Sequence, residues 1–366
     1  MPGIWAGVDI GKKHHHAVVI NAEGERLLSR RVQNDETELL QLLGDVLEIS
    51  DDVLWAVDIN HGIAALLIGL LLNHDQPIAY LTGRAVHQAA ATYRGEGKTD
   101  ARDAFIIADQ ARVRRDVSML RPGDEIAIDL RLLTARRLDL VYDRTRQINR
   151  LRAQLLEFFP ALERALDLTK KGPITLLTGY QTPAAIRHMG AKRLETWLRN
   201  RKVRDAAALA HRAAEAARAQ LTALPGEQLA AEIVARQASA VMAHHEEVAE
   251  LDARIEARFR RHQDAEVILS LPGMGPTLGA EFIAATGGDL SAFGSPDRLA
   301  GFAGLAPVPW DSGSVSGNLR RPRRYHRGLQ RSMFLSAQVS ARFCPVSKAY
   351  YDRKRSEGKG HKQAVL

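Results

Sequence analysis

The sequence has one cysteine, Cys344, among its 366 residues. A single thiol excludes disulfide bonds within the chain and any zinc site built from cysteines. Such cysteine usage is typical of a reducing compartment, and we expect a cytoplasmic protein. The N-terminus lacks the charged start and long apolar core of a signal peptide. The apolar run 63–72 is far too short to span a bilayer, so no membrane partner is expected.

Aromatic residues are also scarce, at 5% of the chain, so base stacking on aromatic platforms is not the binding mode that the composition favours. Acidic residues are missing from the whole segment 312–351. Residues 1–110 hold 9 Lys and Arg against 16 Asp and Glu, whereas the remainder holds 42 against 27. This asymmetry indicates that the second part of the chain meets a polyanion, although a basic, solvated surface would give the same count.

The apolar patterns of the first 120 residues predict an α/β domain. Three strands come first, followed by helices that alternate with two more strands. This order is typical of a ribonuclease-H-like layered fold in a domain of residues 1–120. The predicted strands are 4–10, 16–21, 26–33, 53–58 and 77–81, and the predicted helices are 35–48, 62–72, 84–92 and 100–115.

The remaining sequence predicts helices. Residues 124–166 have the spacing of one long amphipathic helix or a pair, and residues 191–262 read as long helices, with a coiled coil as one form they can take. We interpret 121–262 as a helical arm, a spacer or dimerisation element rather than a ligand site. Residues 263–366 are expected to form a mostly α-helical C-terminal domain that begins with helix, tight glycine turn and helix.

Four aspartates form the first candidate site. Asp9 and Asp58 end predicted strands, and Asp100 and Asp103 open a helix on one face. If the fold brings these carboxylates together, their repulsion requires cations, and oxygen-only ligands suit Mg²⁺ or Mn²⁺. Asp100 and Asp103 are equally compatible with acids that favour a helix N-terminus. His14, His15 and His16 are interpreted as phosphate contacts or solvated residues rather than metal ligands.

The second candidate site is Ser312, in a glycine-bearing loop beside arginines that can bind phosphate oxygens. A serine needs a base or a metal to become a nucleophile, and His326 is the only nearby histidine. Ser314 and Ser316 are rivals for this role. The turn at Gly273 and Gly275 resembles a helix-hairpin-helix, whose amides would hold a phosphate. The candidate nucleic-acid contacts are Gly273, Gly275, Arg320, Arg321, Arg323, Arg324, Arg327 and Arg331.

In these motifs the sequence resembles one family, the bacterial insertion-sequence transposases of the DEDD type (the one-ten insertion-sequence family). The matching segments occur in the order that the family shows. They are Gly7-Val8-Asp9-Ile10-Gly11-Lys12, Lys98-Thr99-Asp100-Ala101-Arg102-Asp103-Ala104, Leu271-Pro272-Gly273-Met274-Gly275, and residues 299–307 followed by Asp311-Ser312-Gly313. The second acidic position departs from the family, because Asp58 stands where a glutamate is usual.

The resemblance implies a RuvC-like N-terminal domain, a helical arm and a C-terminal transposase domain. It implies that Asp9, Asp58, Asp100 and Asp103 hold Mg²⁺ and that Ser312 attacks DNA to form a phosphoserine link. It further implies strand exchange between element and target, guidance by a structured RNA, and homo-oligomers with composite sites. The catalytic set that we predict is therefore Ser312 with the four aspartates.

Three other functions remain open at this point. A resolvase-like nuclease would use metal-activated water and leave Ser312 structural. A catalytically inactive RNA- or DNA-binding protein would bind without cutting. An actin-like ATPase would use residues 9–12 as a phosphate loop, although the D-x-x-D pair and the arginine-rich segment argue against it.

Overall fold

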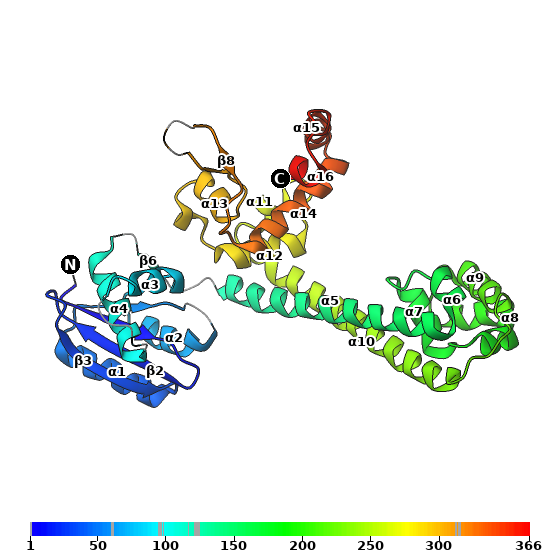
Figure 1. The fold of residues 1–366 in the computed structure, drawn as a ribbon, viewed down its shortest axis with the longest axis horizontal. Helices are drawn as coiled ribbons and strands as arrows, with labels where there is room; N and C mark the ends of the chain where they lie inside the picture. Colours follow the sequence, from blue (N-terminus) through cyan, green and yellow to red (C-terminus); the bar gives the residue numbers. More distant parts are fainter. Residues whose placement is uncertain are drawn as a thin grey trace. The chain divides into compact units, whose positions relative to one another are not determined.

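The computed structural model describes residues 2–59, 62–93, 97, 99–115, 117–120, 125–311, 313 and 316–366. The chain divides into two compact units, residues 1–122 and 123–366. Figure 1 shows the two units, and each is described here by itself.

The first unit is built on a mixed six-stranded sheet in the order β3-β2-β1-β4-β5-β6. The first three strands form an antiparallel meander, and β4 and β5 continue the sheet parallel to β1. The predicted α/β class and its five strands are confirmed. The strands are β1 (Ile4–Asp9), β2 (His14–Ile20), β3 (Arg26–Gln33), β4 (Val53–Val57), β5 (Ile78–Tyr80) and β6 (Ser118–Leu120).

Helices cover both faces of this sheet (Figure 1). On one face, α1 (Glu36–Ile49) and α2 (Ala65–Asn73) pack with Val8, Val19 and Trp55. On the other, α3 (Gly83–Ala90) and α4 (Asp100–Val113) pack with strand residues of the opposite alternation, such as Val18 and Ala56. A short 3-10 turn, η1 (Gly62–Ala64), precedes α2.

Two long helices form the base of the second unit, α5 (Glu125–Phe158) and α10 (Glu227–Phe259). They are antiparallel, because Arg258 pairs with Asp129 near the start of α5, whereas Glu247 pairs with Arg136 further along it. The predicted long helices are therefore confirmed. Coiled-coil packing between them stays a prediction.

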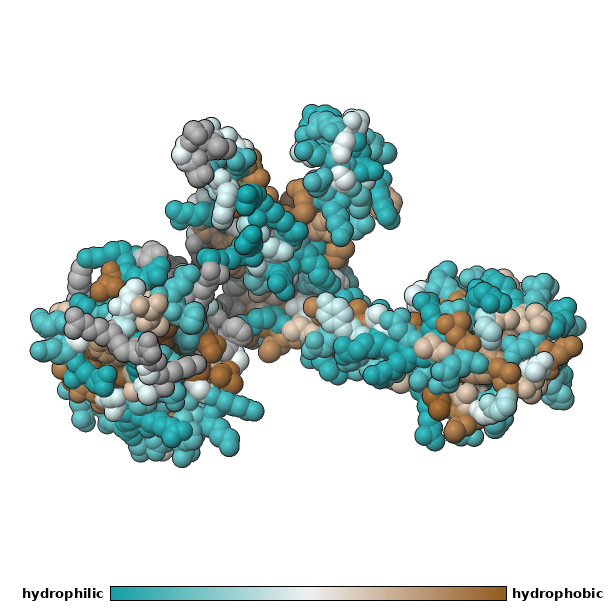
Figure 2. All heavy atoms as spheres, in the orientation of Figure 1, coloured by the Kyte–Doolittle hydropathy of each residue, from teal (hydrophilic) through white to brown (hydrophobic). Residues whose placement is uncertain are grey.

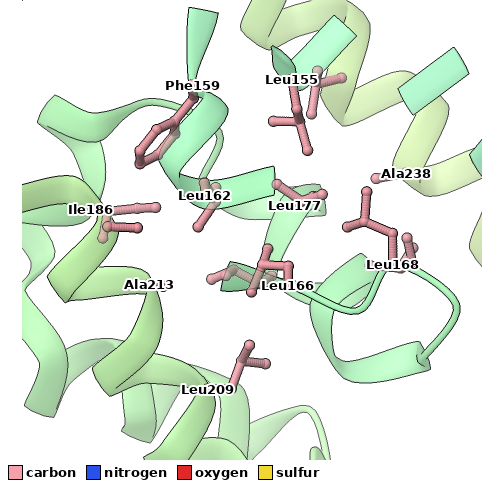
Figure 3. Packing of buried hydrophobic residues seen from close by; sticks show 14 of the residues in the cluster. Leu155, Phe159, Leu162, Leu166, Leu168, Leu177, Ile186, Leu209, Ala213 and Ala238 are labelled. Atoms are coloured by element: carbon pink, nitrogen blue, oxygen red, sulfur yellow. The ribbon is translucent and has the colours of Figure 1, made fainter. Parts of the chain in front are cut away.

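Four helices close the far end of this pair and make a small bundle that the sequence patterns did not predict as a unit. They are α6 (Pro160–Ala165), α7 (Lys171–Gly179), α8 (Pro183–Asn200) and α9 (Ala206–Arg218). Figure 3 shows Phe159, Leu162 and Leu177 packing into one apolar core with Leu155 of α5 and Ala238 of α10. We call residues 159–226 the arm tip.

The C-terminal helices pack on the other end of α5 and α10, where Leu130, Ile255 and Phe259 meet Phe282 and Leu329. These elements are α11 (Ala265–Leu269), α12 (Pro276–Thr286), η2 (Leu290–Phe293), α13 (Pro296–Phe302), β7 (Val308–Pro309), β8 (Leu319–Arg320), α14 (Arg327–Phe343), α15 (Pro345–Ser356) and α16 (His361–Val365). Hydrophilic residues cover most of the visible surface of α15 (Figure 2). Among the described residues, no helix has the length and apolar character that crossing a membrane requires.

Candidate active site

Strand register brings two of the predicted aspartates to one edge of the sheet. β1 and β4 are parallel, with Gly7 opposite Ala56 and Val8 opposite Val57. Asp9 ends β1, and Asp58 follows β4 directly. Both therefore lie at the carboxyl ends of neighbouring strands, and alternation points both toward the face that α4 covers.

The start of α4 supplies the other two aspartates. Thr99 caps the helix by accepting a hydrogen bond from the backbone N–H of Arg102 at 3.2 Å. Asp100 and Asp103 then occupy the first turn, Asp100 exposed and Asp103 half-buried. The charge of Asp103 acts on Asp58, and that of Asp100 acts on His16. We call the four aspartates the carboxylate edge.

Asp58 is an aspartate of the carboxylate edge that lies in a partly buried, poorly solvated position. Its Oδ1 is buried and has no hydrogen-bond partner among the described residues. Burial raises the pKa of Asp58 above its ordinary value of 3.8, and the negative charge of Asp103 raises it further. Unpaired carboxylate oxygens fit the ligand set of a hard divalent cation. Within the described ranges, however, no three His, Cys, Asp or Glu side chains form a ready-made metal-binding group.

We expect Asp58→Asn to raise the thermal midpoint of the metal-free protein at pH 7 by a few degrees, the order of shift that ~1 kcal/mol produces. The folded-state pKa of Asp58 is raised, so its contribution to stability is full below the unfolded value and is lost as pH rises through the folded value. The variant avoids this loss. The gain should vanish below about pH 3.8, where wild-type Asp58 is protonated in both states. A thermal melt across pH measures it, and a variant less stable at pH 7 would contradict the argument.

Gly7 explains how α4 comes so close to the strand. An added Cβ at this position would lie 2.3 Å from the carbonyl oxygen of Ala104 and 2.3 Å from the backbone nitrogen of Ala108. Only a glycine permits this approach of helix backbone to strand backbone. Because Gly7 is two residues before Asp9, and Ala104 follows Asp103, the close contact fixes the spacing between the carboxylates.

Gly7→Ala should therefore lower the free energy of unfolding by about 1–3 kcal/mol, because α4 must move off the sheet. A matched control exists in the same unit. Gly44 is exposed in α1, where an added Cβ meets nothing within 4 Å, so Gly44→Ala should stabilise by about 0.5–1 kcal/mol. Denaturant titration of both variants checks the pair, and equal effects would show that position 7 tolerates a side chain.

The three consecutive histidines separate in the structure. His15 faces α1 and α2 at only 1% exposure, and burial lowers the pKa of its imidazole, so its interpretation as a phosphate contact or solvated residue is wrong. His16 lies opposite Asp9 in the β1–β2 register, and its Nε2 is 3.0 Å from Ser29 Oγ. Burial lowers the pKa of His16, whereas the charge of Asp100 opposes this shift.

Ser312 and its rival Ser314 lie outside the described residues. The base of their loop is described, since Trp310 donates its N–H to the carbonyl of Asn318 at 2.7 Å between β7 and β8. Asp311 Oδ1 accepts the N–H of Asn318 at 3.0 Å. His326 caps α14 by accepting the N–H of Leu329 on Nδ1 at 3.0 Å, which occupies the nitrogen a general base would use.

The six predicted arginines differ in their surroundings and fall into three groups. Arg331 pairs with Glu281, and Arg321 donates to Gln330 Oε1 at 2.7 Å, so both stabilise the C-terminal fold. Arg320 lies over the ring of Trp310, which is 56% exposed. The remaining three, Arg323, Arg324 and Arg327, are exposed and available to phosphate.

The two candidate glycines differ as well. At Gly273, with φ +79°, an added Cβ would lie 2.2 Å from the carbonyl oxygen of Ser336, so this glycine packs the turn against α14. Gly275 caps α12 and has open space around it. The helix, turn and helix are present as α11 and α12, and their use as a phosphate-binding hairpin stays a prediction.

Two family models match this sequence. Residues 6–160 match a model described as "Transposase", and residues 265–352 match one described as "Transposase IS116/IS110/IS902 family". The 42 kDa protein of insertion element IS900 from Mycobacterium paratuberculosis is 58% identical over 99% of this chain and 92% of its own length. The chain belongs to this family of transposases.

Other relatives of the transposase align just as fully. The 44.8 kDa protein of IS116 from Streptomyces clavuligerus is 50% identical over 99% of this chain and 91% of its own. The 43.6 kDa protein of IS110 from Streptomyces coelicolor is 36% identical over 100% and 90%. A solved structure, T. thermophilus RuvC in complex with a Holliday junction substrate, has 16% identity, a TM-score of 0.26, and covers 32% of this chain and 99% of that one.

Proposed function

We propose that this transposase cuts and rejoins DNA strands of an insertion sequence through a covalent link between Ser312 and DNA. The carboxylate edge, with Mg²⁺ or Mn²⁺, would serve the same reaction. The single observation that carries the proposal is the carboxylate edge itself. Asp9 and Asp58 stand at the carboxyl ends of neighbouring parallel strands, the charge of Asp103 acts on Asp58, and the buried Oδ1 of Asp58 has no partner among the described residues, which together support a shared site.

The strand order also favours this function. An antiparallel meander followed by parallel strands is the arrangement expected of a ribonuclease-H-like, RuvC-like domain, for which we propose residues 1–120. We propose residues 121–262 as the arm and 263–366 as the C-terminal transposase domain. The helix-hairpin-helix, with Gly273 and Gly275, and the exposed arginines Arg320, Arg323, Arg324 and Arg327 would hold DNA phosphates. Arg321 and Arg331 would support this surface through their contacts with Gln330 and Glu281. A guide RNA and a homo-oligomer are proposed from the family resemblance.

Each step of the proposed reaction breaks one phosphoester bond and forms another. Ser312 Oγ would attack phosphorus and form a phosphoserine ester, while the deoxyribose oxygen departs and takes up a proton. Attack by a second DNA hydroxyl on that ester restores the phosphodiester and returns Ser312 to its free form. A divalent cation bound to the carboxylates would polarise the phosphoryl oxygens and stabilise the leaving oxygen.

The test is strand transfer by the purified full chain, supplied with element-end DNA, target DNA and the RNA that co-purifies with it. Joined products that need a divalent cation are expected. Cut but unjoined ends with no protein attached would instead identify a nuclease that uses water. Binding without any scission in Mg²⁺ would leave a nucleic-acid-binding protein and would refute the proposal.

A further inference from the structure

The arm tip is a strongly cationic surface on a separately packed core. Residues 159–226 hold 12 Lys and Arg against 5 Asp and Glu. They lie almost wholly between the segments that the two family models match, 6–160 and 265–352. The cations are Arg164, Lys170, Lys171, Arg187, Lys192, Arg193, Arg199, Arg201, Lys202, Arg204, Arg212 and Arg218. A simple spacer or dimerisation element has no need of such an excess.

Half of these cations cluster at the end of α8 and in the turn to α9. Six Lys and Arg between residues 192 and 204 are all exposed, and the only acid in this stretch before Asp205, Glu195, pairs with Arg199 at 2.5 Å. Arg193 is used within the fold, since its Nε donates to the carbonyl of Met189 at 2.8 Å. The turn itself therefore presents Arg201, Lys202 and Arg204 outward.

The backbone of this turn places a lysine where glycine is usual. Val203 donates its N–H to the carbonyl of Leu198 at 3.2 Å, and Lys202 donates to Arg199 at 2.9 Å, which together make a Schellman motif at the end of α8. Lys202 occupies its left-handed position with φ +59°. A non-glycine residue at such a position is strained, and strained residues occur preferentially at functional sites.

Neighbouring side chains pack against the turn. Arg201 lies over the ring of Trp197 at 3.7 Å, and Trp197 in turn packs edge-on against Tyr180. The space beside Gly172 is filled by Val203, whose Cγ1 would lie 3.0 Å from an added Cβ. Lys170 and Lys171 immediately precede Gly172, so the start of α7 adds positive charge beside the turn.

We propose that the α8–α9 turn binds a nucleic-acid backbone through its phosphates. The proposal rests on the proposed function, which supplies DNA and RNA as partners, and it extends the binding surface beyond the C-terminal domain. The C-terminal helices pack at Leu130 of α5 and the arm tip packs at Leu155. The two surfaces are therefore separated along α5 by twenty-five helical residues, which span ~38 Å, the length of about 11 base pairs of duplex.

The experiment compares the full chain with two variants, K202G and the double variant K202Q/R204Q. Each is titrated with a 40-base-pair DNA duplex and with a hairpin RNA of equal stem length, over a range of salt. Binding should weaken by up to about tenfold for each lost contact at 0.1 M salt, and the slope of log K against log salt should fall by about one per contact. The stretch of DNA phosphates that the bound protein protects should also shorten by about one helical turn of the duplex.

K202G separates binding from folding. Glycine suits the left-handed position, so its thermal midpoint should equal or exceed that of the wild type while affinity falls. The charge-matched control is R136Q/R146Q on α5, because both arginines already pair with carboxylates, Glu247 and Asp143. This control should bind almost as the wild type does.

The nucleic acid that loses affinity, DNA or RNA, identifies which backbone the turn holds. Unchanged affinity and salt slope for both substrates in K202Q/R204Q would overturn the proposal, as would equal weakening in the control. Failure of the proposed function would give a different result from failure of this inference. In that case the chain binds nucleic acid with tip-dependent affinity but never cuts or joins strands.

Discussion

Ser312→Ala is expected to abolish covalent attachment of the transposase to DNA. Without Oγ no phosphoserine ester can form, and loss of an active-site nucleophile typically lowers turnover by about 10⁴- to 10⁶-fold. The measurement uses a suicide DNA substrate whose nicked strand diffuses away after cleavage. The wild-type chain should then run as a protein–DNA adduct on a denaturing gel, and the variant should not.

Neighbouring serines provide the controls. Ser316→Ala changes an exposed residue of the same loop and tests the first rival assignment, and it should leave the adduct intact. Ser314→Ala tests the second rival assignment. An adduct that persists in Ser312→Ala but disappears in Ser314→Ala would move the nucleophile by two residues. Cleavage without an adduct in the wild type would leave water as the nucleophile.

The sequence predicted the first unit well because its elements have strong, local patterns. Apolar alternation located β1 to β5, and the positions of Asp9 and Asp58 at strand ends followed from those strands. Strand β6 was missed, since three residues paired only to β5 give too short a pattern to recognise. The departure of His15 from its expected role has a similar cause, because alternation alone does not say which face of a strand is covered.

Longer-range packing was harder to predict. Gly7 lies in a motif that the sequence already showed. The reason for a glycine there depends on tertiary structure, because its backbone contacts Ala104 and Ala108 almost 100 residues later. The arm tip was missed because its helices are rich in alanine, such as Ala206, Ala210 and Ala213, and form a core only when four helices meet. Gly273 has a further role that only tertiary structure shows, its packing against α14, and its contact with phosphate stays a prediction.

Asp103→Asn should lower metal-dependent strand cleavage by about 100- to 1,000-fold, the size of effect seen when one group that stabilises transition-state charge is removed. Asp103 is the residue whose charge raises the pKa of Asp58, so the two carboxylates share one electrostatic environment. A cation placed there would be held by both. Neutralising Asp103 should weaken binding of the cation, because less negative charge remains at the site to hold it.

Two readouts together distinguish a metal-binding role for Asp103 from a structural one. In metal-free protein, removing its charge relieves Asp58, so the thermal midpoint should rise or stay unchanged. Added Mg²⁺ should stabilise the wild type by mass action and the variant much less. Asp51→Asn is the control, since Asp51 is exposed just before the opposite end of β4. A carboxylate that serves only the helix dipole stabilises the fold with or without a cation. Asp103 would therefore be assigned to the helix N-terminus alone if the variant lost stability in the absence of metal, or if it responded to Mg²⁺ as the wild type does.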